Sequence, residues 1–237
     1  MSDHALRDLL IACADTKLLL GYHYGEWTFG TPELEAAVAS CSLSQAEMGH
    51  VRLLHAILKK QWDCDPDALV ETRDRAEFAN IAFLDRPLAD WADFVAMNVV
   101  VDLAVTRVLH SLRESTVQAI QVNVAKMLDE ERYHAHHGRG WFRTMAADPA
   151  QRDRLSAATA RALASARVWF GPDHADLAAA LKADIDGISP AGVAVRELPA
   201  PDFAKWNPVT RRIGGGAPEE EILYHLRGTR NAIFKLN

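Results

Sequence analysis

The chain has 237 residues, a net charge of −6 and 49% hydrophobic residues, a composition that fits a single globular domain and excludes a disordered chain. Its acidic balance argues against nucleic acid or an anionic membrane as the main partner, and no apolar stretch is long enough to cross a bilayer. Because the first ten residues lack a secretory signal and the three cysteines are scattered, we expect a cytoplasmic protein.

Helical periodicity dominates the whole chain, and no run shows the alternation that is typical of strands. The third helix is expected to begin at Leu88 or Trp91, and the fourth is expected to break softly at Gly138 and Gly140. The expected helices cover about residues 3–24, 31–60, 88–112, 115–145, 151–170, 174–185 and 219–234, with a short helix over 76–83.

The segments between these helices carry turn and cap signals. Thr31 is expected to cap the second helix, with Pro32 in its first turn. Residues 187–216 are rich in Gly and Pro and are expected to form a surface strap. Within that strap, Arg211 and Arg212 fit a solvated basic loop better than a phosphate cradle.

Two Glu-x-x-His pairs are the most informative motifs. They are Glu47-Met-Gly-His50 and Glu131-Arg-Tyr-His134, and each lies in the apolar stripe of a long expected helix. Positions i and i+3 share one helix face, so each pair can present an oxygen and a nitrogen ligand to the same point. Di-iron and di-manganese bundles take one such pair from each of two helices and one carboxylate from each of the other two.

Asp102 strengthens this prediction because it interrupts an apolar run over residues 99–105. A buried carboxylate without a partner is costly, so Asp102 is either a metal ligand or the partner of a buried base. We therefore predict that Glu47, His50, Asp102, Glu131 and His134 are metal ligands. Asn98, one turn before Asp102, is expected to hold a ligating carboxylate by a hydrogen bond.

The contribution of the first helix is open. Glu26 lies at the turn, roughly 22 Å from the height of Glu47 at 1.5 Å per residue. Asp15 is the best-placed acid, although it lies about one helical turn off. Lys17, at a similar height, either supplies a positive charge in place of one metal ion or packs its alkyl chain on the surface.

These features together predict an all-α, ferritin-like four-helix bundle with extra C-terminal helices. We expect one domain over residues 1–237, with the core bundle over about 3–148 and the additional helices and strap over about 149–237.

The chain also resembles the ferritin-like subunits of the bacterial phenylacetyl-coenzyme A epoxidase. The resemblance extends over about residues 10–175 and depends on the order of several short motifs. These are Gly25-Glu26-Trp27, Pro32-Glu33-Leu34-Glu35, Gln45-Ala46-Glu47-Met48-Gly49-His50, Thr72-Arg73-Asp74, Trp91-Ala92-Asp93, Val101-Asp102, Glu130-Glu131-Arg132-Tyr133-His134 and Phe170-Gly171-Pro172.

That family has two kinds of bundle subunit, one that binds a di-iron centre and one structural partner that has lost ligands. The five predicted ligands match the catalytic kind, whereas the Gly25-Glu26-Trp27 turn and the Arg132-Tyr133-His134 segment look like the structural kind. Ungapped matching places Lys17 where the catalytic kind has a glutamate on its first helix.

The resemblance implies two iron ions, or iron with manganese, and a requirement for dioxygen and an external reductant. It also implies an aromatic or acyl coenzyme A thioester as substrate. The implied protein partners are a reductase and either a second copy or a related bundle subunit. The alternative is a non-catalytic structural subunit with a degenerate metal site.

Overall fold

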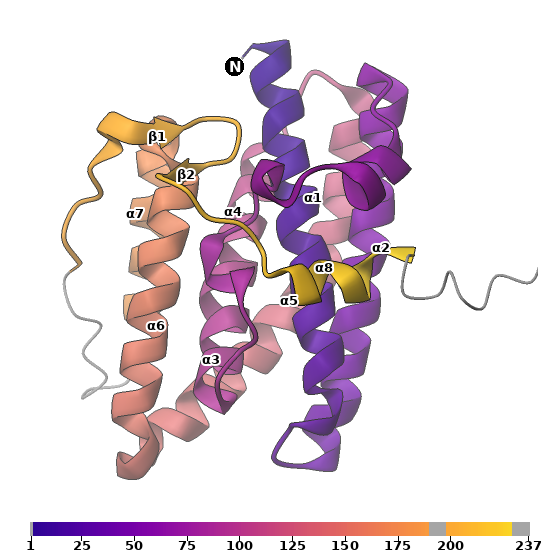
Figure 1. Cartoon of the computed structure of the whole chain (residues 1–237). Helices are drawn as coiled ribbons and strands as arrows, with labels where there is room; N and C mark the ends of the chain where they lie inside the picture. The colour runs from indigo at the N-terminus through magenta and orange to yellow at the C-terminus, as the bar shows by residue number, and fades with distance from the viewer. Residues whose placement is uncertain (1, 190–197, 229–237) are drawn as a thin grey trace, which may run out of the picture.

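The computed structural model describes residues 2–189 and 198–228 and consists mainly of helices (Figure 1). Four long helical rods make the bundle, two further helices cover one side of it, and a short helix follows a two-stranded hairpin. The long elements are α1 (Asp3–Glu26), α2 (Leu34–Trp62), α3 (Trp91–Ala96), η5 (Met97–Asp102), α4 (Leu103–Ser111), α5 (Gln118–Ala147), α6 (Pro149–Phe170) and α7 (Ala175–Ile188). The hairpin and the last helix are β1 (Trp206–Asn207), β2 (Arg212–Ile213) and α8 (Glu220–Leu226).

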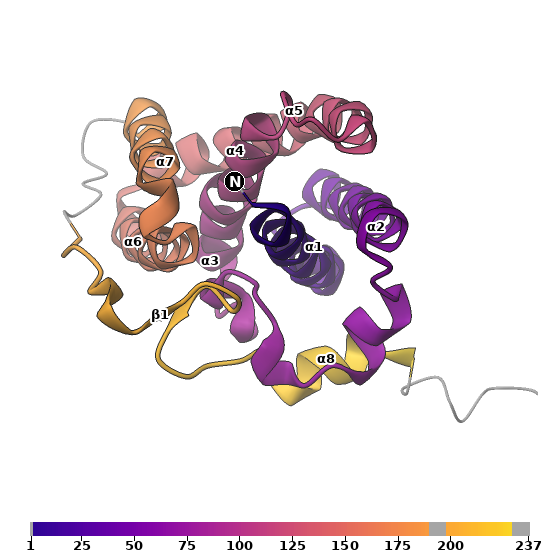
Figure 2. The ribbon, with the colours of Figure 1, turned by 90° about the horizontal axis from the view of Figure 1, so that it is seen from above.

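Helix α1 lies inside the bundle and is surrounded on nearly every side. From Leu9 to Tyr24 almost every side chain of this helix is buried, including the polar ones. A helix that buries its whole circumference must lie in the core. Figure 2 shows α1 with α2 on one flank and the α3–η5–α4 rod on the other, which sets its side chains at the centre of the molecule.

The third rod is one continuous helix with a wider turn in its middle. Asp90 caps its start by accepting a hydrogen bond from the Asp93 backbone N–H, and the rod ends at Ser111, as the sequence predicts within one residue. The stretch η5 is a π-helix, a form that is rare and is found mostly at functional sites. Asp102 is the last residue of this stretch.

Helix α5 runs unbroken through both glycines, so the predicted soft break is wrong. Gly138 lies where α5 packs against η5, and a Cβ atom there would collide with Oδ1 of Asn98. Gly138 therefore permits a close approach of two helices, whereas Gly140 faces open space.

Two other local predictions need correction. Glu33, not Thr31, lies at the N-cap of α2, and the Thr31 hydroxyl donates to the Glu33 carbonyl instead. The connection before α3 has no helix over 76–83 but three short helical turns, η2 (Ala68–Thr72), η3 (Arg75–Glu77) and η4 (Ala82–Asp85).

The C-terminal strap begins later than expected and contains strands. Gly187 still belongs to α7, and the hairpin pairs Trp206 with Ile213 and Asn207 with Arg212. Arg211 and Arg212 are buried, so the prediction of a solvated loop is wrong. The expected last helix over 219–234 is too long, because α8 ends at Leu226 and Arg227 is already in an extended conformation; residues 229–234 lie outside the described part of the chain.

Among the described helices, none combines the length and the apolar character that a membrane span requires.

Candidate metal centre

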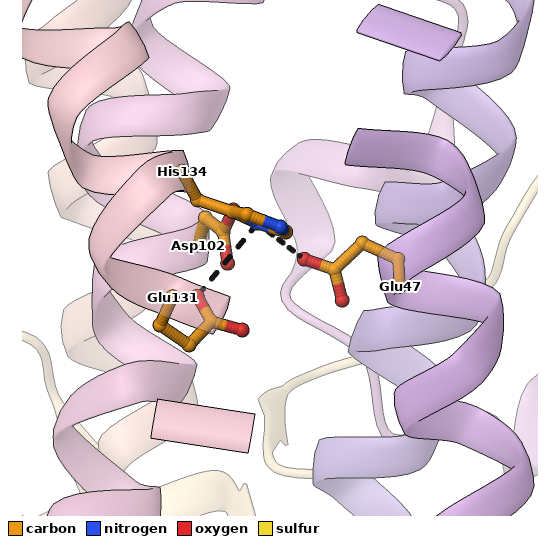
Figure 3. A group of neighbouring side chains, drawn as sticks. All are labelled: Glu47, Asp102, Glu131 and His134. Carbon is orange, nitrogen blue, oxygen red and sulfur yellow. Dashed lines mark hydrogen bonds and ion pairs between the residues drawn. The ribbon is translucent and has the colours of Figure 1, made fainter. Parts of the chain in front are cut away.

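The structure brings together the acidic and imidazole side chains that the motifs predict. Glu47 reaches in from α2, Asp102 from the end of η5, and Glu131 and His134 from α5 (Figure 3). Each offers a ligand atom, and these four atoms all lie within 4.8 Å of one another. None of the four residues is more than 3% exposed, because their positions on the Glu-x-x-His faces and in the apolar run turn them into the bundle. The cluster can hold a metal ion.

Lys17 lies at the centre of these carboxylates. Its side chain comes from α1 and is completely buried, which rules out the prediction of a surface lysine. Its Nζ atom donates to one oxygen of each carboxylate, at 2.9 Å from Glu47, 2.9 Å from Asp102 and 2.5 Å from Glu131. Burial alone would lower the Lys17 pKa, but the three carboxylates outweigh it and raise that pKa well above its usual value.

Two histidines complete the cluster. The Nδ1 atom of His134 lies 2.9 Å from Asp102 Oδ2 and 3.2 Å from Glu47 Oε1. Burial lowers the pKa of His134, but the charge of Asp102 and the hydrogen bonds to Asp102 and Glu47 outweigh it, and the pKa rises to about 11. Burial also lowers the pKa of His50, yet its contacts with Glu131 and Glu47 raise that pKa to about 9.

Acidic and basic groups are equal in number in this cluster. Three carboxylates face the ammonium group and two imidazoles whose pKa values are raised, while burial and the charge of Asp102 raise the pKa of Glu131. His50 lies at the edge of the cluster and is the one predicted ligand outside the group of four within 4.8 Å. Its Nε2 is 3.0 Å from Oε2 of Glu130. The Glu130 side chain is 42% exposed and covers His50 from outside.

Three further side chains hold the carboxylates in place. The Tyr24 hydroxyl donates to Asp102 Oδ2 at 2.9 Å, and the amide of Asn98 donates to that hydroxyl, so Asn98 supports Asp102 through Tyr24 and not by the direct hydrogen bond that was predicted. Thr106 Oγ1 lies 2.9 Å from Glu131 Oε2. Tyr24 and Thr106 were not predicted from the sequence. Helical spacing could have found both, since Tyr24 follows Lys17 by two turns and Thr106 follows Asp102 by one.

Neither Asp15 nor Glu26 of α1 joins the cluster. Asp15 forms an ion pair with Arg73 and accepts a hydrogen bond from the Ala79 backbone at 2.8 Å, so it anchors the connection before α3. Glu26 is exposed at the end of α1. The position that the two-metal pattern requires on the first helix is thus filled by the ammonium group of Lys17.

This donor set does not fit the two-metal pattern of carboxylate bundles. That pattern needs four carboxylates and two histidines, with one carboxylate from each helix that lacks a Glu-x-x-His pair. Here three carboxylates and two histidines surround a fixed cation that makes short contacts to all three carboxylates.

Comparison with known proteins identifies the family. The sequence profile described as "Phenylacetic acid catabolic protein" matches residues 1–234, nearly the whole chain. The chain is similar to a subunit of the 1,2-phenylacetyl-CoA epoxidase of Escherichia coli (strain K12), with 30% identity over 129 residues. That match covers 54% of this chain and 52% of the relative, so it spans about half of each. The chain therefore belongs to the phenylacetic acid catabolic protein family, whose members have the ferritin-like fold.

Proposed function

We propose that this chain is a non-catalytic bundle subunit of a multicomponent oxygenase that resembles phenylacetyl-CoA epoxidase. The observation that carries the proposal is the position of Lys17, whose ammonium group contacts all three carboxylates of the cluster. A metal ion that bound these oxygens would have to displace a buried charge that already neutralises them.

The physical role of Lys17 is to take the place of metal charge. Three buried carboxylates near one point would repel one another and take up protons unless cations faced them. Lys17 and the two protonated histidines supply those cations without a metal ion. The centre of the bundle thereby acts as an ionic crosslink between α1, α2, η5 and α5.

In this proposal the chemistry takes place on a partner. The similar protein from Escherichia coli is named as a subunit of an epoxidase, which supports assembly with other chains. The partner we propose is a related bundle subunit that holds the di-iron centre. The coenzyme A thioester, dioxygen and the reductase would act at that subunit, and this chain would stabilise it.

A second candidate is a subunit that binds one metal ion at the cluster, and two observations favour it. Glu47, Asp102, Glu131 and His134 meet the distance requirement for one ion. In addition, Oε2 of Glu47 and Nδ1 of His50 are buried, lack a well-formed hydrogen bond among the described residues and lie 3.7 Å apart. The three carboxylates carry three negative charges, and Lys17 supplies one positive charge. One divalent ion could supply the other two in place of the two protonated histidines.

Metal analysis of the purified chain separates these candidates. Protein from cells grown with added iron and manganese would be measured by elemental mass spectrometry, with Glu131→Ala as the metal-ligand control. We expect far less than one metal ion per chain in the native protein, and no oxidation of phenylacetyl-CoA when a reductase and dioxygen are supplied. Near-stoichiometric iron or manganese that is lost in Glu131→Ala, together with such oxidation, would refute the proposal.

The variant Lys17→Glu provides the complementary measurement. It restores a carboxylate at the position where the two-metal pattern needs one and removes the competing cation. We expect this variant to take up iron that the native protein excludes. The variant Lys17→Met removes the cation without adding a ligand, and it should bind less iron than Lys17→Glu if the fourth carboxylate matters.

A further inference from the structure

A groove rich in arginine runs along the outside of α5 and shares one wall residue, Glu131, with the buried cluster. It has a volume of about 580 Å³ and is bounded by α4, α5 and Asp184 in the C-terminal half of α7; α4 lies between the other two helices in Figure 2. Its basic and imidazole side chains are Arg107, His110, Arg132, His136, Arg139 and Arg143. Such a concentration of basic side chains in one groove is unexpected in a chain whose net charge is −6.

The arrangement on α5 follows from helical spacing. Arg132, His136, Arg139 and Arg143 are separated by four, three and four residues, so they form one stripe on the same face. Like charges at i and i+4 destabilise a helix, so Arg139 and Arg143 are unfavourable neighbours unless an anion lies between them.

The acids near the groove do not neutralise this stripe. Asp184 is already paired with Arg107, whose Nε donates to it at 2.7 Å. Glu131 forms the inner wall and is engaged by Lys17. Arg132 lies 3.7 Å from Asp129. Across residues 2–189 and 198–228, no carboxylate lies within ion-pair distance of Arg139 or Arg143, and both side chains are exposed.

We propose that this groove binds a small molecule with a diphosphate group, of about the size of a nucleoside diphosphate, through Arg139 and Arg143. The planar guanidinium group donates two parallel hydrogen bonds to phosphate oxygens, which makes arginine the preferred residue for such groups. Side chains on successive helical turns lie roughly 5–6 Å apart, a spacing that suits two neighbouring phosphates. The volume of the groove falls in the range of about 300–1,000 Å³ that is usual for small-molecule sites.

The inner end of the groove limits what the ligand can reach. The adjoining pocket, which leads past Leu103 and Thr106 to Asp102 and His134, has a volume of only about 20 Å³. That space holds about one water molecule. The ligand therefore stays in the groove, on the outer side of Glu131, and does not contact Lys17.

Calorimetric titration of the full chain tests this site. Pyrophosphate and ADP are the probes, and citrate at the same ionic strength, about 0.15 M, tests for unspecific attraction of anions. The test variant is R139Q/R143Q, which keeps hydrogen-bonding side chains but removes both charges. Its control is R52Q/R154Q, which removes the same charge from two exposed positions on α2 and α6.

The proposal predicts saturable binding of both phosphate probes by the native chain and by R52Q/R154Q. Binding should weaken about tenfold or more in R139Q/R143Q, while the urea midpoint of that variant stays at or above the native value because a repulsion is removed. The proposal is overturned if neither probe saturates, if both double variants lose affinity equally, or if citrate binds as tightly as pyrophosphate.

Discussion

Two buried basic side chains in this molecule, Lys17 and Arg211, have different kinds of partner. In the bundle, Lys17 contacts three carboxylates that come from α2, η5 and α5. Under the C-terminal strap, Arg211 donates to the backbone carbonyls of Trp169, at 2.6 Å, and Phe170, at 2.7 Å, and pairs with no carboxylate of the described residues. The first centre balances full charges, and the second satisfies the carbonyls at the end of α6.

The difference explains why one residue is a lysine and the other an arginine. An ammonium group is a compact charge that can meet three oxygens from three directions, as a metal ion does. A guanidinium group is a planar fork that meets two carbonyls in fixed directions, which suits the unpaired carbonyls of a helix end. We therefore expect the stability of the bundle centre to depend on charge and that of the strap to depend on hydrogen bonding.

The largest effect is expected for Lys17→Met, which removes the charge but keeps most of the side-chain volume. Removal of one partner from a buried ionic network costs about 3–5 kcal/mol, because the remaining charges stay buried without compensation. The free energy of unfolding, measured by urea denaturation at pH 7, should fall by this amount.

Adding Glu131→Gln to Lys17→Met provides a control for charge. The second substitution removes one of the carboxylates that Lys17 neutralised, so part of the lost stability should return. If Lys17→Met alone costs less than about 1 kcal/mol, the carboxylates do not depend on Lys17 and the contrast between the two centres fails.

A smaller loss, about 1–3 kcal/mol, is expected for Gly138→Ala, because its Cβ would displace Asn98. Asn98 supports Tyr24, which in turn donates to Asp102, so the damage reaches the charged centre. Gly140→Ala is the matched control on the same helix, where a Cβ atom meets open space. It should raise the thermal midpoint, since alanine favours a helix more than glycine does. Equal effects of the two substitutions would refute the close-approach argument.

The sequence alone predicted the bundle and most of its centre because both depend on helical periodicity. The Glu-x-x-His spacing indicated which faces turn inward, and the apolar run around Asp102 indicated its burial. The sequence did not predict whether the Lys17 side chain is buried, since a lysine on an inner helix face and a lysine at the surface have the same local pattern. Only the packing of α1 among the other helical segments, α2, α4 and η5 among them, decides between these positions.

Features that depend on distant contacts were beyond sequence reasoning. The π-helical turn at η5 differs from an α-helix in that its hydrogen bonds span five residues and not four, which no apolar pattern of this length reveals. Gly138 looks like a helix breaker until Asn98 of another rod is known to face it. Arg211 and Arg212 look like a solvated loop because their partners lie about 40 and 130 residues earlier in the chain.

Acid should weaken the packing of α1 against η4. His23 is buried beside η4, where its Nε2 lies 3.0 Å from the Leu84 carbonyl, and burial lowers its pKa from 6.5 to about 4. Because the unfolded chain binds this proton more readily, stability falls as pH falls from about 6.5 toward 4, by about 1.4 kcal/mol per pH unit. His23→Gln should give a flatter profile in urea denaturation between pH 5 and 6.5. An unchanged slope would place the acid sensitivity elsewhere.

For Arg211→Met we expect a loss of about 1–3 kcal/mol in urea denaturation, smaller than that of Lys17→Met, because the two carbonyls it leaves are uncharged. Residue 211 has a left-handed backbone, φ 55°, and methionine is strained there as much as arginine is because both have a Cβ atom. The substitution therefore tests the guanidinium group alone. The lost contacts include the stacking of Arg211 on Trp169 and Trp206, at 5.3 Å from each ring. Because the hairpin covers the end of α6, hydrogen exchange should rise at Trp206 more than in α5. If Arg211→Met lowers the free energy of unfolding as much as Lys17→Met does, the stability of the strap also depends on charge.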